Sequence, residues 1–178
     1  KRFVCALLAL VLLVGLVPVT ASAAENKISE SAITVLKQLK QFKATCYYVS
    51  GSEYRVGYGT VCREKHHFDV NGRPKATADN KHTISEKKAD TALRTYLTEL
   101  DKKVNSFASS NGLTLSQSQH DALVVYSHVA GTAWLGGTGT LKSAIVSKAG
   151  ATELLNVLDR LDETNSERNQ VIVDMYVH

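Results

Sequence analysis

The sequence lacks several features that would place it in a common functional class. Its 21 basic and 17 acidic residues are too nearly balanced to indicate nucleic-acid binding. It contains no internal repeat and no low-complexity linker, which favours one compact domain. Its histidines and cysteines show no spacing typical of metal ligands. We therefore expect a single soluble domain that needs no metal or other cofactor.

The sequence also has few long apolar runs: it contains one, near its start. Lys1 and Arg2 precede an apolar run over residues 3–19, and Ala21-Ser22-Ala23 has the small-x-small pattern that signal peptidase accepts. We expect residues 1–23 to be a secretory signal; the alternative is a retained anchor, because the run is nearly long enough to span a bilayer. Cleavage would leave 178 − 23 = 155 residues, one domain over 24–178 that is secreted, without a stable membrane anchor.

Cysteine is rare, and two cysteines remain after the expected cleavage, Cys46 and Cys62. An even pair in an exported protein is the usual setting for a disulfide. A bond between them would close a short loop and stabilise the fold by roughly 3 kcal/mol in the chain-entropy model. The alternative is a metal site with His66, His67 or His82, but these histidines lie in a polar stretch that reads as a solvated loop.

The apolar spacing predicts an α+β fold that is mostly helical, with one small sheet near the amino end. Aromatic and β-branched residues on both sides of a Gly-Ser turn indicate a β-hairpin over residues 46–59. Residues 63–82 are polar and charged and are expected to form an exposed loop. Helices are predicted where apolar residues recur every three or four positions, some of them opened by capping-box sequences at Thr83 and Ser116: residues 28–42, 85–109, 116–129, 141–148, 152–161 and 166–176.

The segment LKQFKATCYYVSGSEYRVGYGT (39–60) resembles the catalytic hairpin of the phage-type lysozymes, glycoside hydrolase family 24. That family's pattern has a Glu before a Phe, then Tyr-x-Asp, then a Thr before a Gly-Tyr-Gly turn. The likeness extends over nearly the whole chain after residue 23, in the right order. It is carried by TISEKKAD (83–90), LTLSQSQHDAL (113–123), GTAWL (131–135) and Arg168, where the family has a basic pair.

The resemblance implies a lysozyme-like fold, in which a long helix links the sheet to a helical lobe. It also aligns the family's catalytic Glu, Asp and Thr, without a gap, on Lys40, Val49 and Arg55. Glycosidic bond cleavage needs a carboxylic acid that protonates the leaving oxygen, and usually a second carboxylate. Lysine is a poor substitute acid, valine carries no charge, and two cations would repel the positively charged transition state. The substitutions favour an inactive protein over an enzyme.

We therefore expect a secreted, monomeric pseudo-muramidase that engages bacterial peptidoglycan, or another anionic cell-wall glycan, without cutting it. Lys40 and Arg55 would suit the carboxylates of stem peptides or the phosphates of teichoic acids. The resemblance places substrate-binding side chains at Tyr58, Gln119 and Trp134.

Two other functions stay open at this stage. The first is an active muramidase with a non-standard acid. Glu53 is the first candidate because it lies two residues before Arg55 and shares its face on a regular strand. Other acids for this active muramidase would come from the 63–82 loop: Glu64, Asp69 or Asp79. The second alternative is a module that binds or regulates another protein.

Overall fold

The structure is a computed structural model that describes residues 26–50, 53–61 and 84–178. The expected signal over residues 1–23 and the expected loop over 63–82 lie outside these ranges. No helix among the described residues is long and apolar enough to cross a membrane. The elements are α2 (Glu30–Lys40), β1 (Lys43–Ser50), β2 (Glu53–Gly57), β3 (Thr60–Val61), α3 (Glu86–Ser110), α4 (Gln117–Ala130), η2 (Ala133–Leu135), α5 (Thr140–Val146), α6 (Ala151–Leu161), η3 (Glu163–Asn165) and α7 (Ser166–Val177).

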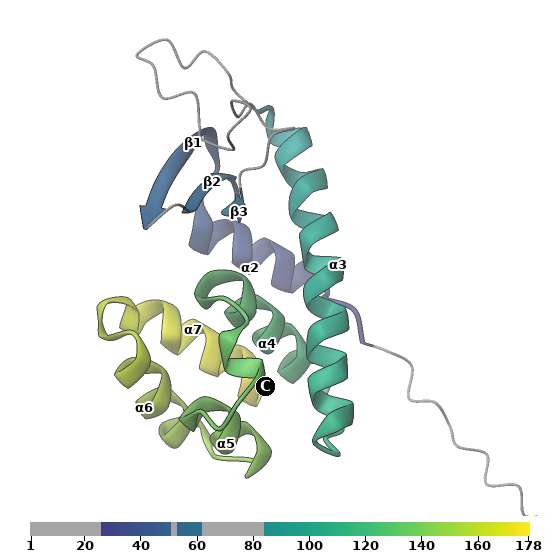
Figure 1. The fold of residues 1–178 in the computed structure, drawn as a ribbon, viewed down its shortest axis with the longest axis vertical. Coiled ribbons are helices and arrows are strands. Elements are labelled where there is room, and N and C mark those ends of the chain that lie inside the picture. The colour runs from purple at the N-terminus through teal and green to yellow at the C-terminus, as the bar shows by residue number, and fades with distance from the viewer. Residues whose placement is uncertain (1–25, 51–52, 62–83) are drawn as a thin grey trace, which may run out of the picture.

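The expected architecture is confirmed, with a small sheet beside one end of α3 and a helical lobe beside the other (Figure 1). Helix α4 lies inside the lobe, where α7, α3 and α2 pack against it. Most of α4 is therefore buried, including polar residues such as His120 and His128. Leucines at helical spacing on α3 are fully buried in the hydrophobic core: Leu93, Leu97 and Leu100.

Serine caps start the first three described helices. The Ser116 side chain accepts a hydrogen bond from the Gln119 N–H while the Gln119 side chain accepts one from the Ser116 N–H, which confirms the predicted capping box. At α3 the predicted capping residue, Thr83, was two positions too early. The capping residue is Ser85, whose hydroxyl accepts a hydrogen bond from the Lys88 N–H at 3.3 Å. The sequence offers serine or threonine at both 83 and 85, and spacing alone does not choose between them.

Helix α2 is shorter at both ends than the predicted 28–42. Ser29 is its N-cap and accepts from the Ala32 N–H, so Ile28 precedes the helix. At the other end Gln41 has φ +39°, which α-helix cannot accommodate, and the helix stops at Lys40. Phe42 therefore leaves the apolar stripe and is 36% exposed, with its ring 5.7 Å from that of Tyr58.

The sheet has three antiparallel strands in the order β1-β2-β3, one more than the predicted hairpin. Arg55 at the centre of β2 pairs with Tyr47 on one side and Val61 on the other. The turn after β2 lies against α3: a β-carbon built on Gly57, which has φ +63°, would be 2.7 Å from the β-carbon of Ala89. Cys46 lies in β1, but Cys62 lies outside the described residues, so the expected disulfide stays a prediction.

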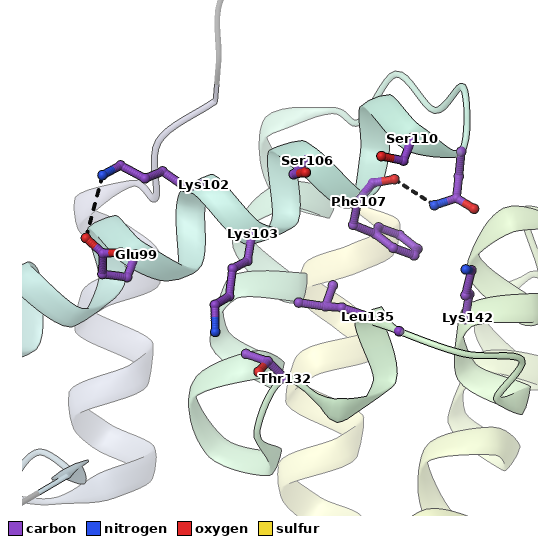
Figure 2. A pocket seen from close by; sticks show the side chains of 11 residues that line it. Glu99, Lys102, Lys103, Ser106, Phe107, Ser110, Thr132, Leu135 and Lys142 are labelled. Carbon is purple, nitrogen blue, oxygen red and sulfur yellow. Dashed lines mark hydrogen bonds and ion pairs between the residues drawn. The ribbon is translucent and has the colours of Figure 1, made fainter.

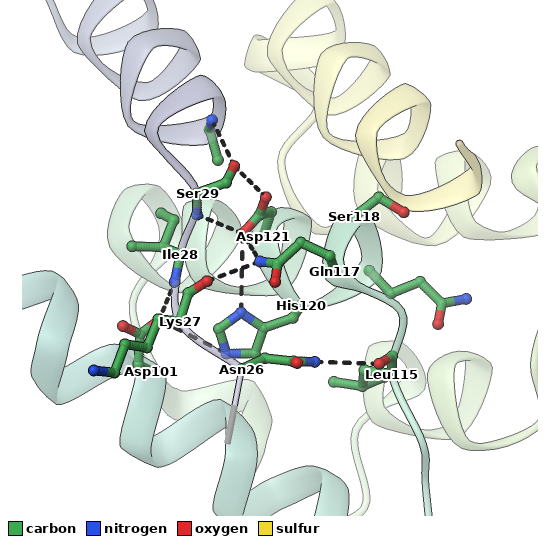
Figure 3. Close-up of polar contacts among 12 residues, drawn as sticks. Asn26, Lys27, Ile28, Ser29, Asp101, Leu115, Gln117, Ser118, His120 and Asp121 are labelled. Atoms are coloured by element: carbon green, nitrogen blue, oxygen red, sulfur yellow. Dashed lines mark hydrogen bonds and ion pairs between the residues drawn. The ribbon is translucent and has the colours of Figure 1, made fainter. Parts of the chain in front are cut away.

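The segment before α2 is held by two buried carboxylates (Figure 3). Asp101 of α3 accepts the backbone N–H of Ile28, and Asp121 of α4 accepts both the N–H and the hydroxyl of Ser29. The buried His120 ring lies between them, its nitrogens 3.7 Å from Asp101 and 3.9 Å from Asp121. The chain therefore enters α2 from a fixed position, and α2 in turn presents its last residue, Lys40, to the sheet.

Candidate functional site

Lys40 is the last residue of α2, and its half-buried side chain lies over the turn between β2 and β3. A β-carbon built on Gly59 would be 3.5 Å from Cγ and Cδ of Lys40 and 3.1 Å from Cε1 of His128. Gly59 has φ +85°, so glycine is needed there both for the backbone and for the space. The turn thus brings Lys40 from α2 and His128 from α4 to the same point.

Arg55 connects the sheet to the end of α4. Its Nη1 donates to the backbone oxygen of Gly59 at 3.4 Å and to that of His128 at 3.3 Å. His128 is in the last turn of α4, where the helix dipole favours a cation. The guanidinium therefore has a structural role, and it adds a fixed positive charge beside Lys40.

His128 is a neutral imidazole inside this cluster. It is 1% exposed, its ring meets that of Tyr96 edge-on at 5.6 Å, and neither ring nitrogen has a hydrogen-bond partner among the described residues. Burial, followed by the charges of Lys40 and Arg55, lowers the pKa of His128 to about 3. At neutral pH it is therefore uncharged and supplies no acid.

The charges around Lys40 are mostly positive. Burial lowers the pKa of the Lys40 ammonium, and the charges of Arg55 and Arg168 lower it further, with Asp162 partly opposing them. Arg168 donates to Asp162 at 2.8 Å. Hydrogen bonds from Asn165 and then Arg168 lower the pKa of Asp162 to about 2, so this carboxylate is ionised at neutral pH. Its charge is already compensated by its partners, and it has no proton to donate.

Val49 completes the set of family-equivalent positions, and no described contact joins its side chain to this polar cluster. It is in β1, two residues past Tyr47, which pairs with Arg55, and its side chain is 45% exposed. Glu53 begins β2, where its backbone pairs with Ser50. The structure therefore brings Lys40 and Arg55 together, while position 49 contributes an exposed apolar side chain.

The three expected substrate-binding residues have other partners in the structure. The Tyr58 hydroxyl donates to Glu86, which raises the pKa of Tyr58 to about 12, and the Lys37 ammonium lies 5.1 Å from the ring centre. The Trp134 indole N–H donates to the Ser127 hydroxyl at 3.2 Å. Gln119 is in the capping box of α4, nine residues before His128, or about 14 Å along the helix. None of the three is brought to Lys40 by a described contact.

Sequence reasoning missed two members of the cluster, His128 and Asp162. Nothing in the local sequence around His128 indicates that Gly59 lies against it. Asp162 follows α6 and reaches Arg168 across η3, a contact that depends on the fold of the lobe. Among the described residues, no group of three or more His, Cys, Asp or Glu side chains is placed to hold a metal ion.

Comparison with known proteins agrees with the observed fold. The sequence model of a family described as phage lysozyme matches residues 37–174. No curated protein matches the chain. Solved structures with a similar fold include the muramidase domain of SpmX from Asticaccaulis excentricus, at 19% identity and a TM-score of 0.64, covering 86% of this chain and 99% of that domain. A mutant of P22 lysozyme has 19% identity, a TM-score of 0.59 and coverage of 85% and 99%. The endolysin of Escherichia coli O157:H7 phage FAHEc1 has 17% identity, a TM-score of 0.59 and coverage of 85% and 93%.

Proposed function

The chain belongs to the phage lysozyme family, and from this premise we propose that it is a secreted protein that binds bacterial peptidoglycan without hydrolysing it. The observation that supports the proposal is a cationic cluster around Lys40 and Arg55, the positions that the sequence resemblance aligns with catalytic residues of the family. The positive charges of Arg55 and Arg168 act on Lys40 there, and Asp162, which is paired with Arg168, partly offsets them.

This cluster opposes the family's reaction in two ways. A glycosidase needs a protonated carboxyl group at the leaving oxygen. The described groups of this cluster are an ammonium, two guanidinium groups and a neutral imidazole, and its carboxylate, Asp162, is ionised. The transition state also carries positive charge. A unit charge about 5 Å from it, at an effective dielectric constant near 20, would raise its free energy by roughly 3 kcal/mol. Losing the general acid alone typically slows such a reaction by about 10²–10⁴-fold.

The same charges suit an anionic ligand. The pKa of Lys40 is lowered because its ammonium is partly buried beside other cations, and a carboxylate or phosphate bound there would relieve that repulsion. Peptidoglycan carries carboxylates on its stem peptides, so a glycan strand along the sheet would present an anion to this cluster. A charge-assisted hydrogen bond of this kind contributes more than a neutral one.

The test compares the native protein with the triple variant Lys40→Glu, Val49→Asp, Arg55→Thr, using turbidity and muropeptide-release assays and sedimentation with purified peptidoglycan. We expect the native protein to bind without releasing muropeptides and the triple variant to gain activity. Lys27→Glu is the matched control, because it reverses the charge of an exposed lysine outside the cluster. Muropeptide release by the native protein would refute the proposal, and Glu53→Gln would then test the acid named above. Failure of the native protein to sediment with peptidoglycan would refute the binding role.

A further inference from the structure

A groove lies at the end of α3 that is far from the sheet (Figure 2). It has a volume of about 670 Å³ and is formed by the last three turns of α3, the η2 segment and the first turn of α5. Ala89, which meets the sheet, and Ser106, which lines the groove, are 17 residues apart on α3, or about 25 Å along its axis. The groove therefore lies away from the sheet, and the described residues that line it include none of the Lys40 cluster.

Lysines from two different elements stand on opposite walls of this groove. Lys103 extends from α3 towards Thr132, and Lys142 rises from α5 on the far side of Leu135. Within the described part of the chain, neither lysine has an acidic group within 4 Å. A third lysine, Lys102, is 3.6 Å from the exposed carboxylate of Glu99. Three lysines and one glutamate leave the groove with an excess of positive charge.

The floor between the two lysines is apolar and well packed. Phe107 and Leu135 form it, and the Phe107 ring meets the Trp134 ring edge-on at 5.1 Å. The Trp134 indole is itself fixed by its hydrogen bond to Ser127. The rest of the lining consists of neutral donors and acceptors: Ser106, Ser110, Asn111 and Thr132. A ligand that fits therefore carries negative charge at its sides and C–H groups against the floor.

We propose that this groove binds a phosphodiester-linked polyol chain of the teichoic acid type. Successive phosphates would pair with Lys103 and Lys142, because ammonium groups bind phosphate as mobile point charges. The glycerol or sugar carbons between them would lie on Phe107 and Leu135. The choice of a wall polymer as the source of the phosphates rests on the proposed function, whereas the phosphate site itself does not.

The test is titration of the purified protein with a short glycerol phosphate oligomer at low and physiological salt. We expect saturable binding that weakens as salt rises. The double variant Lys103→Gln, Lys142→Gln should bind the oligomer at least roughly tenfold more weakly than the native protein. Glu99→Gln should bind it more tightly, because that change removes a charge that repels the phosphates. Lys87→Gln is the matched control: it removes one exposed lysine from the opposite end of the same helix.

Three outcomes would overturn the proposal. One is no binding of the oligomer, and another is an equal loss of affinity in Lys87→Gln. The third is binding to phosphatidylglycerol vesicles, but not to the soluble oligomer, which would assign the lysines to a lipid surface. Sedimentation with purified peptidoglycan from which the phosphate polymers have been removed tests the Lys40 cluster without the ligand of the groove. Loss of oligomer binding in the double variant with unchanged sedimentation supports the groove, whatever the outcome for the proposed function.

Discussion

His128 should make the stability of this protein depend steeply on pH in the mildly acidic range. Its pKa falls from an ordinary value of 6.5 in the unfolded chain to about 3 in the folded protein, because the imidazole is buried beside Lys40 and Arg55. Between these two values the unfolded chain binds a proton that the folded protein does not. The contribution of His128 to stability is therefore complete above pH 6.5 and is lost as the pH falls towards 3.

The size of the effect follows from the same shift. Each pH unit within this window costs about 1.4 kcal/mol, so the loss is about 2 kcal/mol at pH 5 and at most about 5 kcal/mol near pH 3. His128→Leu removes the titrating group with little change in volume. Because the imidazole nitrogens have no hydrogen-bond partner among the described residues, the variant should lose little stability at pH 7.

The measurement is urea unfolding at pH 7, 6 and 5 for the native protein and for His128→Leu. We expect the free energy of unfolding of the native protein to fall relative to that of the variant by about 2 kcal/mol between pH 7 and pH 5. The exposed terminal histidine is the control, since His178→Leu removes an imidazole without touching the core. If the free energy of unfolding changed with pH by the same amount in the native protein and in His128→Leu, the inference that this ring is buried among positive charges would be wrong.

Two further predictions concern the elements that hold the site in place. Gly57→Ala should lower the free energy of unfolding in urea by more than about 2 kcal/mol, because the new β-carbon would overlap Ala89 and the backbone has a positive φ. Gly112 also has a positive φ but has open space around it, so Gly112→Ala should lower the free energy of unfolding by only about 1 kcal/mol. Equal losses in the two variants would rule out the contact as the cause. Ser29→Ala should lower the melting temperature by removing about 1–2 kcal/mol, since the hydroxyl caps α2 and donates to Asp121; an unchanged melting temperature would contradict that role.

The sequence predicts the helices well where their signals are local. The apolar spacing and the serine caps of α3 and α4 depend on neighbours three or four residues apart, and both helices lie within one residue of the expected bounds. The end of α2 is different: Phe42 continues the apolar spacing, but the positive φ at Gln41 stops the helix two residues earlier. Helix ends of this kind depend on where the chain must go next, here into β1, which local spacing does not specify.

The site is less predictable than the fold because its charges meet only through tertiary contacts. The resemblance placed Lys40 and Arg55 at equivalent positions of a lysozyme, and in the structure both side chains lie against Gly59. The resemblance gave no reason to expect His128 beside Lys40 at Gly59, or Asp162 as the partner of Arg168. His128 lies in α4 and Asp162 follows α6, 34 residues further on (162 − 128), and no pattern in the sequence links them.

This arrangement of charges predicts that a carboxylate at position 40 is not sufficient for activity. In Lys40→Glu the new carboxyl group would face Arg55 and Arg168, which would lower its pKa and hold it ionised at neutral pH. It would then have no proton for the leaving oxygen. Removing the nearer cation as well, in Lys40→Glu, Arg55→Thr, should raise that pKa and allow protonation, and the triple variant adds the second carboxylate at position 49. Muropeptide release should therefore stay undetectable in the single variant, appear in the double and be greatest in the triple, with each activity profile measured from pH 4 to 8. A single variant as active as the triple would show that Arg55 does not act on position 40 and would remove the electrostatic basis for an inactive site.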